Sequence, residues 1–463
     1  MDILLTHGYF LHEDPHELKV MKPYPPLGIL YNAAYLKRAG FDVGVFDTTF
    51  SSLADFEAYI LRERPSVVGL YTNLMTKFNV LKMMAVCKSV GATIILGGPE
   101  PVNYAEEYLT RGADVIVVGE GEATLAELLP RLAQVGAHRL DGVAGVIYRA
   151  EDGSIGRNLA RSYVPDLDAL PDPDREAIDL DRYVETWRTH HGAGSTSLIC
   201  ARGCPYHCEW CSHAVYGNTH RRRSPQRVAA EVDYLLARYK PDQLWYADDV
   251  FTIKHSWLFE YADELKRRNL RVPFECISRA DRLNEQVIDR LAEMGCQRLW
   301  IGSESGSQNV LDLMKREVSV AQVQAMTHAL KRRGIQTGMF IMLGYDGEDE
   351  RDLAATVDHL KKAAPDVFLT TVAYPIKGTP YYAKVTDRVL ARTDWATRSD
   401  RDLSVTGRHS PRYYSFATRW MVNAVALHRE QTTGGRITRQ IKAAANAVIG
   451  RAGMALTKHE RDE

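Results

Sequence analysis

Cys204-Pro205-Tyr206-His207-Cys208-Glu209-Trp210-Cys211 places three cysteines in one short loop, with the spacing C-x3-C-x2-C. Three thiolates in such a loop can hold three irons of a [4Fe–4S] cube and leave the fourth iron without a protein ligand. An open iron can bind a small molecule and do chemistry, whereas a fourth cysteine would close the cluster. The stretch therefore predicts a reactive iron–sulfur centre ligated by Cys204, Cys208 and Cys211.

Two other uses of these cysteines are weighed against the cluster. Zinc could bind them together with His207 or His213, but zinc sites favour C-x2-C pairs separated by a longer span. A disulfide framework is the second alternative. It is disfavoured because one crowded loop holds the three cysteines and no signal peptide precedes them.

Apolar strand-like segments alternate with helical patterns on both sides of the cysteine loop. This alternation is typical of a parallel sheet covered by helices. Parallel α/β sheets bind ligands at the carboxyl ends of their strands. The predicted strands of this part of the chain are Ser197–Ala201, Leu244–Tyr246, Phe274–Ser278, Arg298–Gly302, Gly338–Leu343 and Val367–Ala373.

Polar residues and a glycine stand at the predicted strand ends. Carboxylates can accept hydrogen bonds from a cationic or hydroxyl-bearing ligand, and an arginine can pair with a carboxylate. The structural alternatives are helix N-caps for the aspartates and a surface ion pair for the arginine. In strand order the residues are Asp248 and Asp249, Arg279, Ser303 and Glu304, and Gly344.

The cysteine spacing, the aromatic residue before the last cysteine and the order of these strand ends resemble the radical S-adenosylmethionine (radical SAM) superfamily. The resemblance implies a partial (β/α)6 barrel in which the open iron chelates SAM. One electron from the cluster then breaks the sulfonium C–S bond and yields a 5′-deoxyadenosyl radical. It also implies SAM contacts for Asp248, Asp249, Arg279, Ser303, Glu304 and Gly344, with Trp210 shielding the cluster. Asp346 stands where relatives often have proline, so we expect a looser turn there.

The first 140 residues show five further strand–helix units and predict a doubly wound, Rossmann-like sheet. Its predicted strands are Ile3–Leu5, Asp42–Phe46, Val67–Tyr71, Thr93–Leu96 and Val115–Val118. Glycines at its strand ends would let the backbone approach a ligand closely, or would only form tight turns. The candidate ligand-binding residues at these ends are Thr72, Asn73, Gly97, Gly98, Pro99, Gly119 and Glu120.

The order of these glycine-rich ends resembles the cobalamin-binding domain of the cobalamin-dependent radical SAM enzymes. The resemblance implies that the residues at these ends contact cobalamin. One feature departs from cobalamin domains that ligate cobalt through D-x-H-x-x-G. The nearest stretch, Asp14–Lys19, lacks the glycine, so we expect His16 to be a solvated loop histidine and cobalt to have no protein imidazole.

The amino-acid composition bears on the class of partner and on the cellular compartment. The 463 residues contain 58 basic and 59 acidic side chains, so no strong global field favours a nucleic acid or an anionic membrane as partner, and 45% are hydrophobic. No segment reaches the roughly 20 apolar residues of a membrane-spanning helix. We expect a cytoplasmic protein, because thiolates need a reducing compartment. Cys87, Cys200, Cys276 and Cys296 are expected to be small buried hydrophobes.

The expected domains are a cobalamin-binding domain over 1–140, a proline-rich linker over 141–190, a radical SAM core over 191–390 and a helical cap over 391–463. Val143–Tyr148 is expected to form a hairpin or an edge strand. The tail is basic and carries aromatic residues. A substrate lid, or a surface for a hydrophobic or membrane-held substrate, is the alternative to a cap.

The predicted function is methylation of an unactivated carbon, or of phosphorus, in a small biosynthetic metabolite. An external reductant such as flavodoxin or ferredoxin would supply electrons, and we expect a monomer. Radical cyclisation or oxidation with the same cofactors is the first alternative, and a non-catalytic cluster-bearing sensor or scaffold is the second. A methylthiotransferase needs three further cysteines in an N-terminal domain, whereas only Cys87 precedes Cys200.

Overall fold

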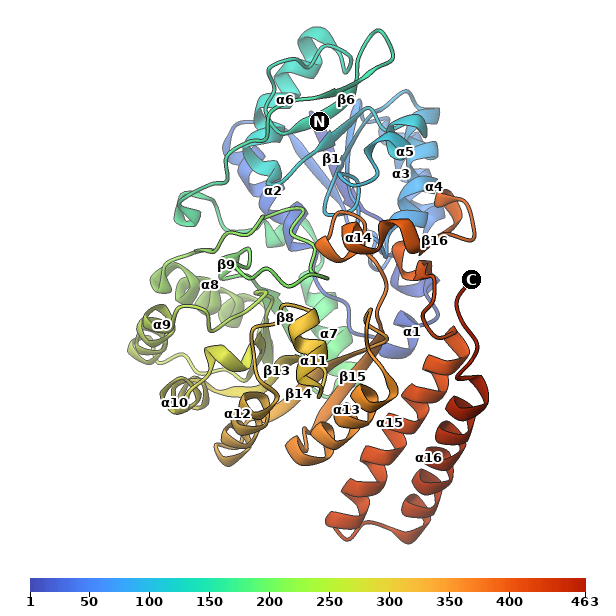
Figure 1. Ribbon diagram of the computed structural model, residues 1–463. Helices are drawn as coiled ribbons and strands as arrows, with labels where there is room; N and C mark the ends of the chain where they lie inside the picture. The colour runs from blue at the N-terminus through green and yellow to red at the C-terminus, as the bar shows by residue number, and fades with distance from the viewer. The chain divides into compact units, whose positions relative to one another are not determined.

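The computed structural model describes residues 1–463, which form two compact units. The first unit contains residues 1–205, 212–245 and 393–399, and the second contains 206–211, 246–392 and 400–463. Both units therefore contain segments that are distant in the sequence (Figure 1).

A seven-stranded sheet with the order β2-β1-β3-β4-β5-β6-β7 forms the centre of the first unit. Strands β1 to β5 pair in parallel, as the strand–helix alternation predicts, and the predicted bounds hold within a few residues. The elements are β1 (Ile3–His7), α1 (Glu17–Val20), α2 (Leu27–Arg38), β2 (Val43–Phe46), α3 (Leu53–Glu63), β3 (Val67–Tyr71), α4 (Lys77–Ser89), β4 (Thr93–Gly97), α5 (Ala105–Thr110), β5 (Val115–Val117) and α6 (Gly121–Val135).

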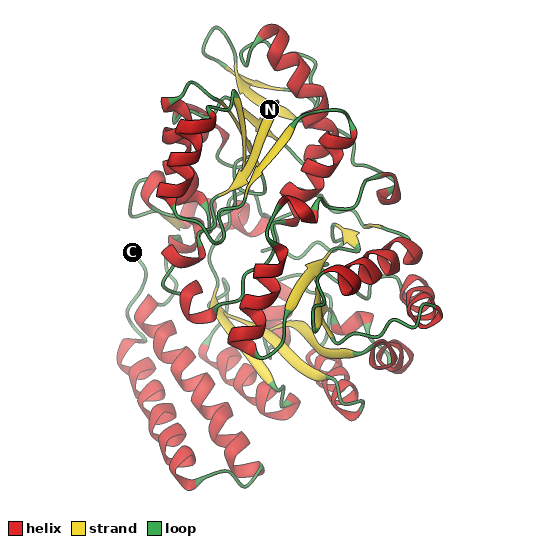
Figure 2. Ribbon diagram, turned by 180° about the vertical axis from the view of Figure 1, so that it is seen from behind, coloured by secondary structure: helices red, strands yellow, loops and turns green.

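Helices cover both faces of this sheet (Figure 2). Helices α2 and α6 contribute Ile29, Leu36 and Leu128 to one apolar core. Helices α3, α4 and α5 contribute Phe56 and Met83, among others, to the core on the opposite face. Burial on both faces explains why the strands read as continuous apolar runs rather than as alternating ones.

The same sheet continues beyond residue 140. Strands β6 (Val146–Arg149) and β7 (Ile155–Arg157) form an antiparallel hairpin beside β5. The segment Val143–Tyr148 therefore contributes one arm of a hairpin, as predicted, whereas the edge strand of the sheet is β7. The proline-rich region that follows also contains a helix, α7 (Leu180–His191), which the sequence interpretation does not include. The buried hydroxyl of Tyr183 in α7 donates a hydrogen bond to Asp47 and is also hydrogen-bonded to the Thr49 hydroxyl, which anchors this helix beyond β2.

A short segment from the carboxyl-terminal region completes the first unit. Lys77 is buried, and its ammonium group donates hydrogen bonds to the carbonyl oxygens of Trp395 (2.6 Å) and Arg398 (2.8 Å). The same group lies 3.7 Å from the centroid of the Trp395 ring, close enough for a cation–π interaction. The indole packs edge-on against Tyr108.

The second sheet has the strand order β15-β14-β13-β12-β11-β8, which confirms a six-stranded sheet and five of the predicted strands within a few residues. The prediction of one continuous strand over Ser197–Ala201 is wrong. Strand β8 ends at Leu198, and Ala201–Arg202 pairs instead with Arg221–Arg222 in a separate antiparallel ribbon, β9–β10. The strands are β8 (Ser195–Leu198), β9 (Ala201–Arg202), β10 (Arg221–Arg222), β11 (Gln243–Tyr246), β12 (Phe274–Ser278), β13 (Cys296–Glu304), β14 (Gln336–Leu343) and β15 (Val367–Val372).

Helices follow most of these strands, and local capping defines several of their starts. Asp349 forms a reciprocal capping box with Asp352 at the start of α13, and Ser224 caps α8 ahead of Pro225. The helices are α8 (Pro225–Arg238), α9 (His255–Arg267), α10 (Glu285–Met294), α11 (Gln308–Leu313), α12 (Val320–Arg332), α13 (Glu350–Ala363) and α14 (Pro380–Val385); the short strands β16 (Val389–Leu390) and β17 (Ser404–Val405) follow α14.

The tail forms a helical hairpin, α15 (Pro411–Thr432) and α16 (Ile437–Thr457). Its first turn lies near the carboxyl end of β14, where Tyr414 approaches Gly344. Near its other end, Arg429 donates a hydrogen bond to Pro365, just beyond α13. Helix α15 thus runs along α13 and extends the outer helical layer, with only its first turn at the strand ends. No helix combines the length and the apolar character needed to cross a bilayer.

Candidate active site

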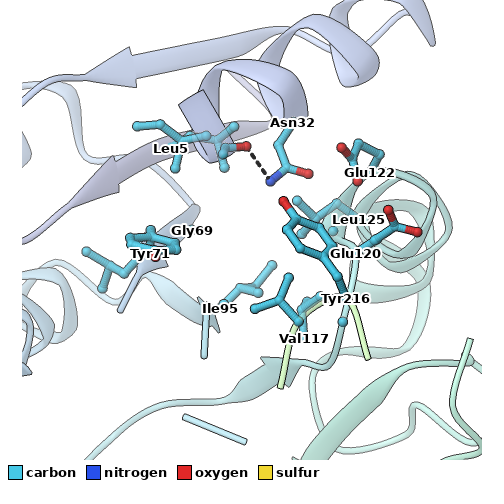
Figure 3. Close-up of a pocket in the computed structure, with 18 of the residues that line it drawn as sticks. Leu5, Asn32, Gly69, Tyr71, Ile95, Val117, Glu120, Glu122, Leu125 and Tyr216 are labelled. Carbon is cyan, nitrogen blue, oxygen red and sulfur yellow. Dashed lines mark hydrogen bonds between the residues drawn. The ribbon is translucent and has the colours of Figure 1, made fainter. Parts of the chain in front are cut away.

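A pocket opens at the carboxyl ends of the first sheet (Figure 3). Leu5 of β1, Ile95 of β4 and Val117 of β5 give it apolar walls, and Leu125 of α6 adds to them. Asn32 and Glu122 are among its few polar groups. Apolar walls with a small number of polar groups are typical of a site for an organic cofactor.

Four of the seven residues predicted for this site line the pocket: Gly97, Gly98, Gly119 and Glu120. Gly97 faces open space, because a Cβ on it would have no heavy atom within 4 Å. Gly98 has a φ of +107°, and a Cβ there would come within 2.3 Å of the carbonyl oxygen of Thr72. Gly97 therefore keeps the pocket open, whereas Gly98 makes the turn possible.

The other three residues are not among those that line the pocket. The backbone nitrogen of Thr72 donates a hydrogen bond to Gly97, and the side-chain oxygen of Asn73 accepts bonds from the backbone at Met75 and Thr76. The carbonyl oxygen of Pro99 accepts a bond from the Asn103 side chain. These contacts stabilise the turns after β3 and β4, and a cofactor contact for Thr72, Asn73 and Pro99 stays a prediction.

Glu120 contributes its charge to a buried cluster. Its carboxylate accepts hydrogen bonds from Arg202 (2.8 Å), from Arg221 (2.9 Å) and from the backbone nitrogen of Val164 (2.7 Å). Glu122 also pairs with Arg202. Two carboxylates and two guanidinium groups therefore join the β9–β10 ribbon to the start of α6. The basic run around Arg221 is therefore paired with carboxylates.

Tyr216, Asn32, Tyr71 and Arg202 line the pocket although the sequence interpretation does not place them there. Figure 3 shows the ring of Tyr216 projecting into the space beside α6. Burial raises the pKa of its hydroxyl to about 12. Tyr216 follows the cysteine loop in the sequence, and nothing in its local pattern indicates a position beside the first sheet.

His16 is exposed, with 80% of its side-chain surface accessible, as expected for a solvated loop histidine. Its Nδ1 lies 3.5 Å from the Glu17 carboxylate, and its backbone nitrogen donates a hydrogen bond to Asp14 (2.7 Å).

Residues 206–211 of the cysteine loop belong to the second unit, where Glu209 anchors them. The Glu209 carboxylate accepts a hydrogen bond from Tyr345 (3.0 Å) and pairs with Lys315 (3.0 Å). Its backbone nitrogen donates to Met314, and its carbonyl oxygen accepts from Tyr381. Trp210 packs against an apolar cluster that contains Met314 and Tyr381.

Two arginines surround Cys208. Arg279 and Arg316 each direct a guanidinium nitrogen at its sulfur, at 3.6 and 3.7 Å. A hydrogen bond from the Cys211 thiol, together with the charges of Arg316 and Arg279, lowers the pKa of Cys208 to about 5. The pKa of Cys211 is raised, because its thiol donates to Cys208 and is buried. A thiolate is the form that binds iron, so this donor set fits a cluster.

Cys204 is partly exposed and lies at the end of a segment of the first unit. The four cysteines outside the loop are all buried, as predicted: Cys87, Cys200, Cys276 and Cys296. No three His, Cys, Asp or Glu side chains converge as they would around a single metal ion.

Arg279 has partners for each guanidinium nitrogen. Its Nε donates to Asp281 (2.8 Å) and one Nη donates to the carbonyl oxygen of Arg316 (2.7 Å), while the other points at Cys208. The guanidinium also lies 3.7 Å from the centroid of the Tyr206 ring. Arg279 therefore supports the cysteine loop in this structure, and its contact with the SAM carboxylate stays a prediction.

Glu304 stands at a bulge at the end of β13 with a φ of +61°, a strained conformation for a residue with a side chain. Burial raises the pKa of its carboxyl group to about 7, although Arg316, 3.9 Å away, acts in the opposite direction. A strained, buried carboxyl group at a strand end is a candidate functional group.

The remaining predicted SAM residues stand at the ends of neighbouring strands. Asp248 is buried after β11, and Asp249 beside it is exposed. Ser303 is buried and hydrogen-bonded to His359 at 3.0 Å. Gly344 follows β14 with a φ of +73°. The turn after Gly344 is held by an ion pair between Asp346 and Arg388 rather than by a proline.

Two family models match this chain. Residues 18–129 match the B12 binding domain, and residues 198–360 match the radical SAM superfamily. The pocket at the first sheet lies largely within the first match, and the cysteine loop lies within the second.

Curated relatives cover most of the chain. An uncharacterized methyltransferase of Pyrococcus horikoshii is 26% identical over 380 residues, which cover 80% of this chain and 81% of the relative. The anaerobic magnesium-protoporphyrin IX monomethyl ester cyclase of Rubrivivax gelatinosus is 25% identical over 393 residues, or 82% and 70% of the two chains.

The fold is shared with a solved structure. The cobalamin-dependent S-adenosylmethionine radical enzyme OxsB, with aqua-cobalamin and S-adenosylmethionine bound, superposes with a TM-score of 0.76 at 16% identity. The match covers 99% of this chain and 72% of OxsB. The N-terminal domain, the radical SAM domain and the helical carboxyl-terminal region of this chain therefore follow a known architecture.

Proposed function

This chain belongs to the cobalamin-dependent radical SAM enzymes, and on that premise we propose that it transfers a methyl group to an unactivated carbon, or to phosphorus, of a small metabolite. The presence of a B12-binding domain and a radical SAM domain in one chain carries the proposal. When bound, the cluster supplies the electron that cleaves SAM, and cobalamin carries the methyl group.

The residues around Cys208 support the cluster assignment. Arg279 and Arg316 supply positive charge next to a buried sulfur, and the Glu209 contacts hold the loop that carries it. We assign Cys204, Cys208 and Cys211 as the ligands of the cluster. The apolar walls around Trp210 would keep water away from it.

We assign SAM to the strand ends that follow β11 to β14. Asp248 is a buried carboxylate suited to the ammonium group, and Glu304 is a buried carboxyl group suited to the ribose hydroxyls. Because the pKa of Glu304 is about 7, this group can accept or donate a hydrogen bond near neutral pH. Asp249, Ser303 and Gly344 complete the proposed SAM site.

We assign cobalamin to the pocket of the first unit. Gly97 has open space where a side chain would stand, and Leu5, Ile95 and Val117 offer apolar surface to an aromatic group. With His16 exposed, we propose that cobalt has no protein imidazole as a ligand.

The test is anaerobic incubation of reconstituted protein with SAM, hydroxocobalamin and a strong reductant. We expect 5′-deoxyadenosine and S-adenosylhomocysteine, because one SAM is the radical source and a second is the methyl source. Cys208→Ala should abolish 5′-deoxyadenosine formation and lower the iron content. Cys87→Ala, the matched control in another part of the fold, should change neither. Zinc without inorganic sulfide in the purified protein would contradict the assignment.

Cyclisation or oxidation is the second candidate, because the Rubrivivax relative is a cyclase. Formation of 5′-deoxyadenosine without S-adenosylhomocysteine would favour that reaction. We further propose a monomer in the cytoplasm, reduced by flavodoxin or ferredoxin, with the domain boundaries at about residues 140, 190 and 390 given by the sequence pattern.

A further inference from the structure

Helix α16 has two faces with side chains of different size. The face toward α15 consists largely of small residues. A Cβ on Gly450 would come within 2.5 Å of the backbone nitrogen of Trp420, and a Cβ on Gly453 would come within 2.3 Å of the Phe416 ring. The two helices can pack this closely only because these positions lack side chains.

The opposite face of α16 consists of large aliphatic residues. Ile437, Ile441, Val448, Ile449 and Leu456 are exposed, with accessible fractions of 73%, 63%, 68%, 46% and 84%. At 3.6 residues per turn, these positions fall on one side of the helix together with the exposed Ala445 and Ala452, whereas Ala443 is buried on the opposite side. Burial would stabilise such side chains, so an exposed aliphatic stripe of this length indicates an interaction surface.

No other helix covers this stripe. Helix α16 packs against α15, which in turn packs against α13 (Figure 1). Because α16 is the outer member of this layer, its aliphatic face points away from the core of the second unit.

The charges of α16 are all positive. The helix contains Arg439, Lys442 and Arg451 and no acidic residue. Arg439 and Arg451 pair with acids of other elements, Glu430 and Glu350. Three cations on or next to α16 have no ion pair in the structure: Arg436 just before the helix, Lys442 within it and Lys458 just after it. These cations complement an anionic surface.

We propose that the α15–α16 hairpin docks on an anionic lipid bilayer through the outward face of α16. A basic helix with one aliphatic face lies in the plane of the membrane interface, with its apolar side chains below the headgroups. The cations on or next to α16 then meet anionic headgroups. The cores of protein–protein interfaces are enriched in aromatic residues and methionine, whereas this face has only aliphatic residues, which favours lipid as the partner. The proposal does not rest on the proposed reaction, because α16 shares no residue with either site.

The test is flotation of the full-length protein with two kinds of vesicle, one of phosphatidylcholine alone and one containing about one-third phosphatidylglycerol. We expect binding to the anionic vesicles that weakens with added salt. The double variant Ile441→Glu/Val448→Glu should lower the bound fraction about tenfold, because two charges would enter the apolar layer. Leu159→Glu is the matched control: it changes a leucine that is 87% exposed in the first unit, and binding should not change.

A second variant tests the charge complement without altering the stripe. Arg436→Gln/Lys442→Gln should weaken binding to the anionic vesicles and leave the weak binding to pure phosphatidylcholine unchanged. It also tests the proposal should the glutamate variant fail to fold, as judged by circular dichroism. Formation of 5′-deoxyadenosine should be equal in all variants, which separates failure of this proposal from failure of the proposed reaction.

The proposal would be overturned if the wild-type protein bound neither kind of vesicle. It would also be overturned if both double variants bound the anionic vesicles as fully as the wild type. So would a concentration-dependent dimer in sedimentation velocity that Ile441→Glu/Val448→Glu abolishes without any vesicle binding. That outcome would assign the stripe to a second copy of this chain.

Discussion

Replacing Arg316 with methionine tests whether the arginines around Cys208 hold the cysteine loop. The substitution removes two hydrogen bonds to the carbonyl oxygen of Gly302 (2.8 and 3.2 Å), the contact with Cys208 (3.7 Å) and the ion pair with Glu304 (3.9 Å). A hydrogen bond from a charged donor contributes about 1.5–3 kcal/mol, and a buried carbonyl left without a donor costs about 1–3 kcal/mol.

The raised pKa of Glu304 limits the free-energy cost of removing Arg316. Removing the cation from a buried pair usually leaves an uncompensated charge and costs about 3–5 kcal/mol. The pKa of Glu304 is already about 7, so at neutral pH its carboxyl group can take up a proton for less than about 1 kcal/mol. We therefore expect Arg316→Met to lower the free energy of unfolding by about 2–4 kcal/mol.

The assay is anaerobic urea unfolding of the protein without iron, followed by circular dichroism, and iron and sulfide analysis after reconstitution. Arg316→Met should also lower the iron content by about half or more, because Cys208 loses a charged donor. Arg316→Lys keeps the positive charge but cannot make both hydrogen bonds to the Gly302 oxygen. Its stability and iron content should therefore lie between those of the wild type and Arg316→Met. Arg333→Met, which removes surface pairs with Asp289 and Glu285, should cost no more than about 1 kcal/mol. A change below about 0.5 kcal/mol with full iron content in Arg316→Met would refute this reasoning.

The remaining predictions concern the pocket, a buried acid and cobalt. Gly97→Val should weaken hydroxocobalamin binding about tenfold without lowering the melting temperature, because a Cβ at this position has no heavy atom within 4 Å and points into the pocket. Gly98→Ala should instead lower the melting temperature, since its Cβ meets a backbone oxygen. Equal binding by wild type and Gly97→Val would contradict the pocket assignment. Burial raises the pKa of Glu348 from 4.5 to about 8, so the folded chain keeps a proton that the unfolded chain releases. The free energy of unfolding should therefore fall as pH rises from 4.5 to 8, by up to about 1.4 kcal/mol per pH unit. This fall should be smaller in Glu348→Gln, and equal slopes for the wild type and Glu348→Gln would contradict the raised pKa of Glu348. Electron paramagnetic resonance of the Co(II) form should show no nitrogen splitting, and a splitting lost in His16→Ala would show that this histidine binds cobalt.

Much of the architecture could be predicted from the sequence because it depends on short-range patterns. The apolar runs at Val67–Tyr71 and Phe274–Ser278 are strands as predicted, since segments buried on both faces leave a continuous signal. The glycines at the ends of β4 and β5 line one pocket, because parallel strands bring their carboxyl ends to one edge of the sheet. The cysteine spacing indicates the cluster because three thiols carried by one short loop can reach the same cube without any long-range packing.

Contacts between segments far apart in the sequence required the tertiary structure. Arg316 follows helix α11, and nothing in the sequence around it predicts a contact with Cys208. In the folded protein its guanidinium group points at the Cys208 sulfur. Trp395 lies in a tail expected to form a cap, but its segment belongs to the first unit, where it packs on Lys77. The sequence determined which segments become strands and helices, and which loop holds the thiols. The tertiary structure decided which charges meet those thiols, because chain closure over more than a hundred residues leaves no trace in local periodicity.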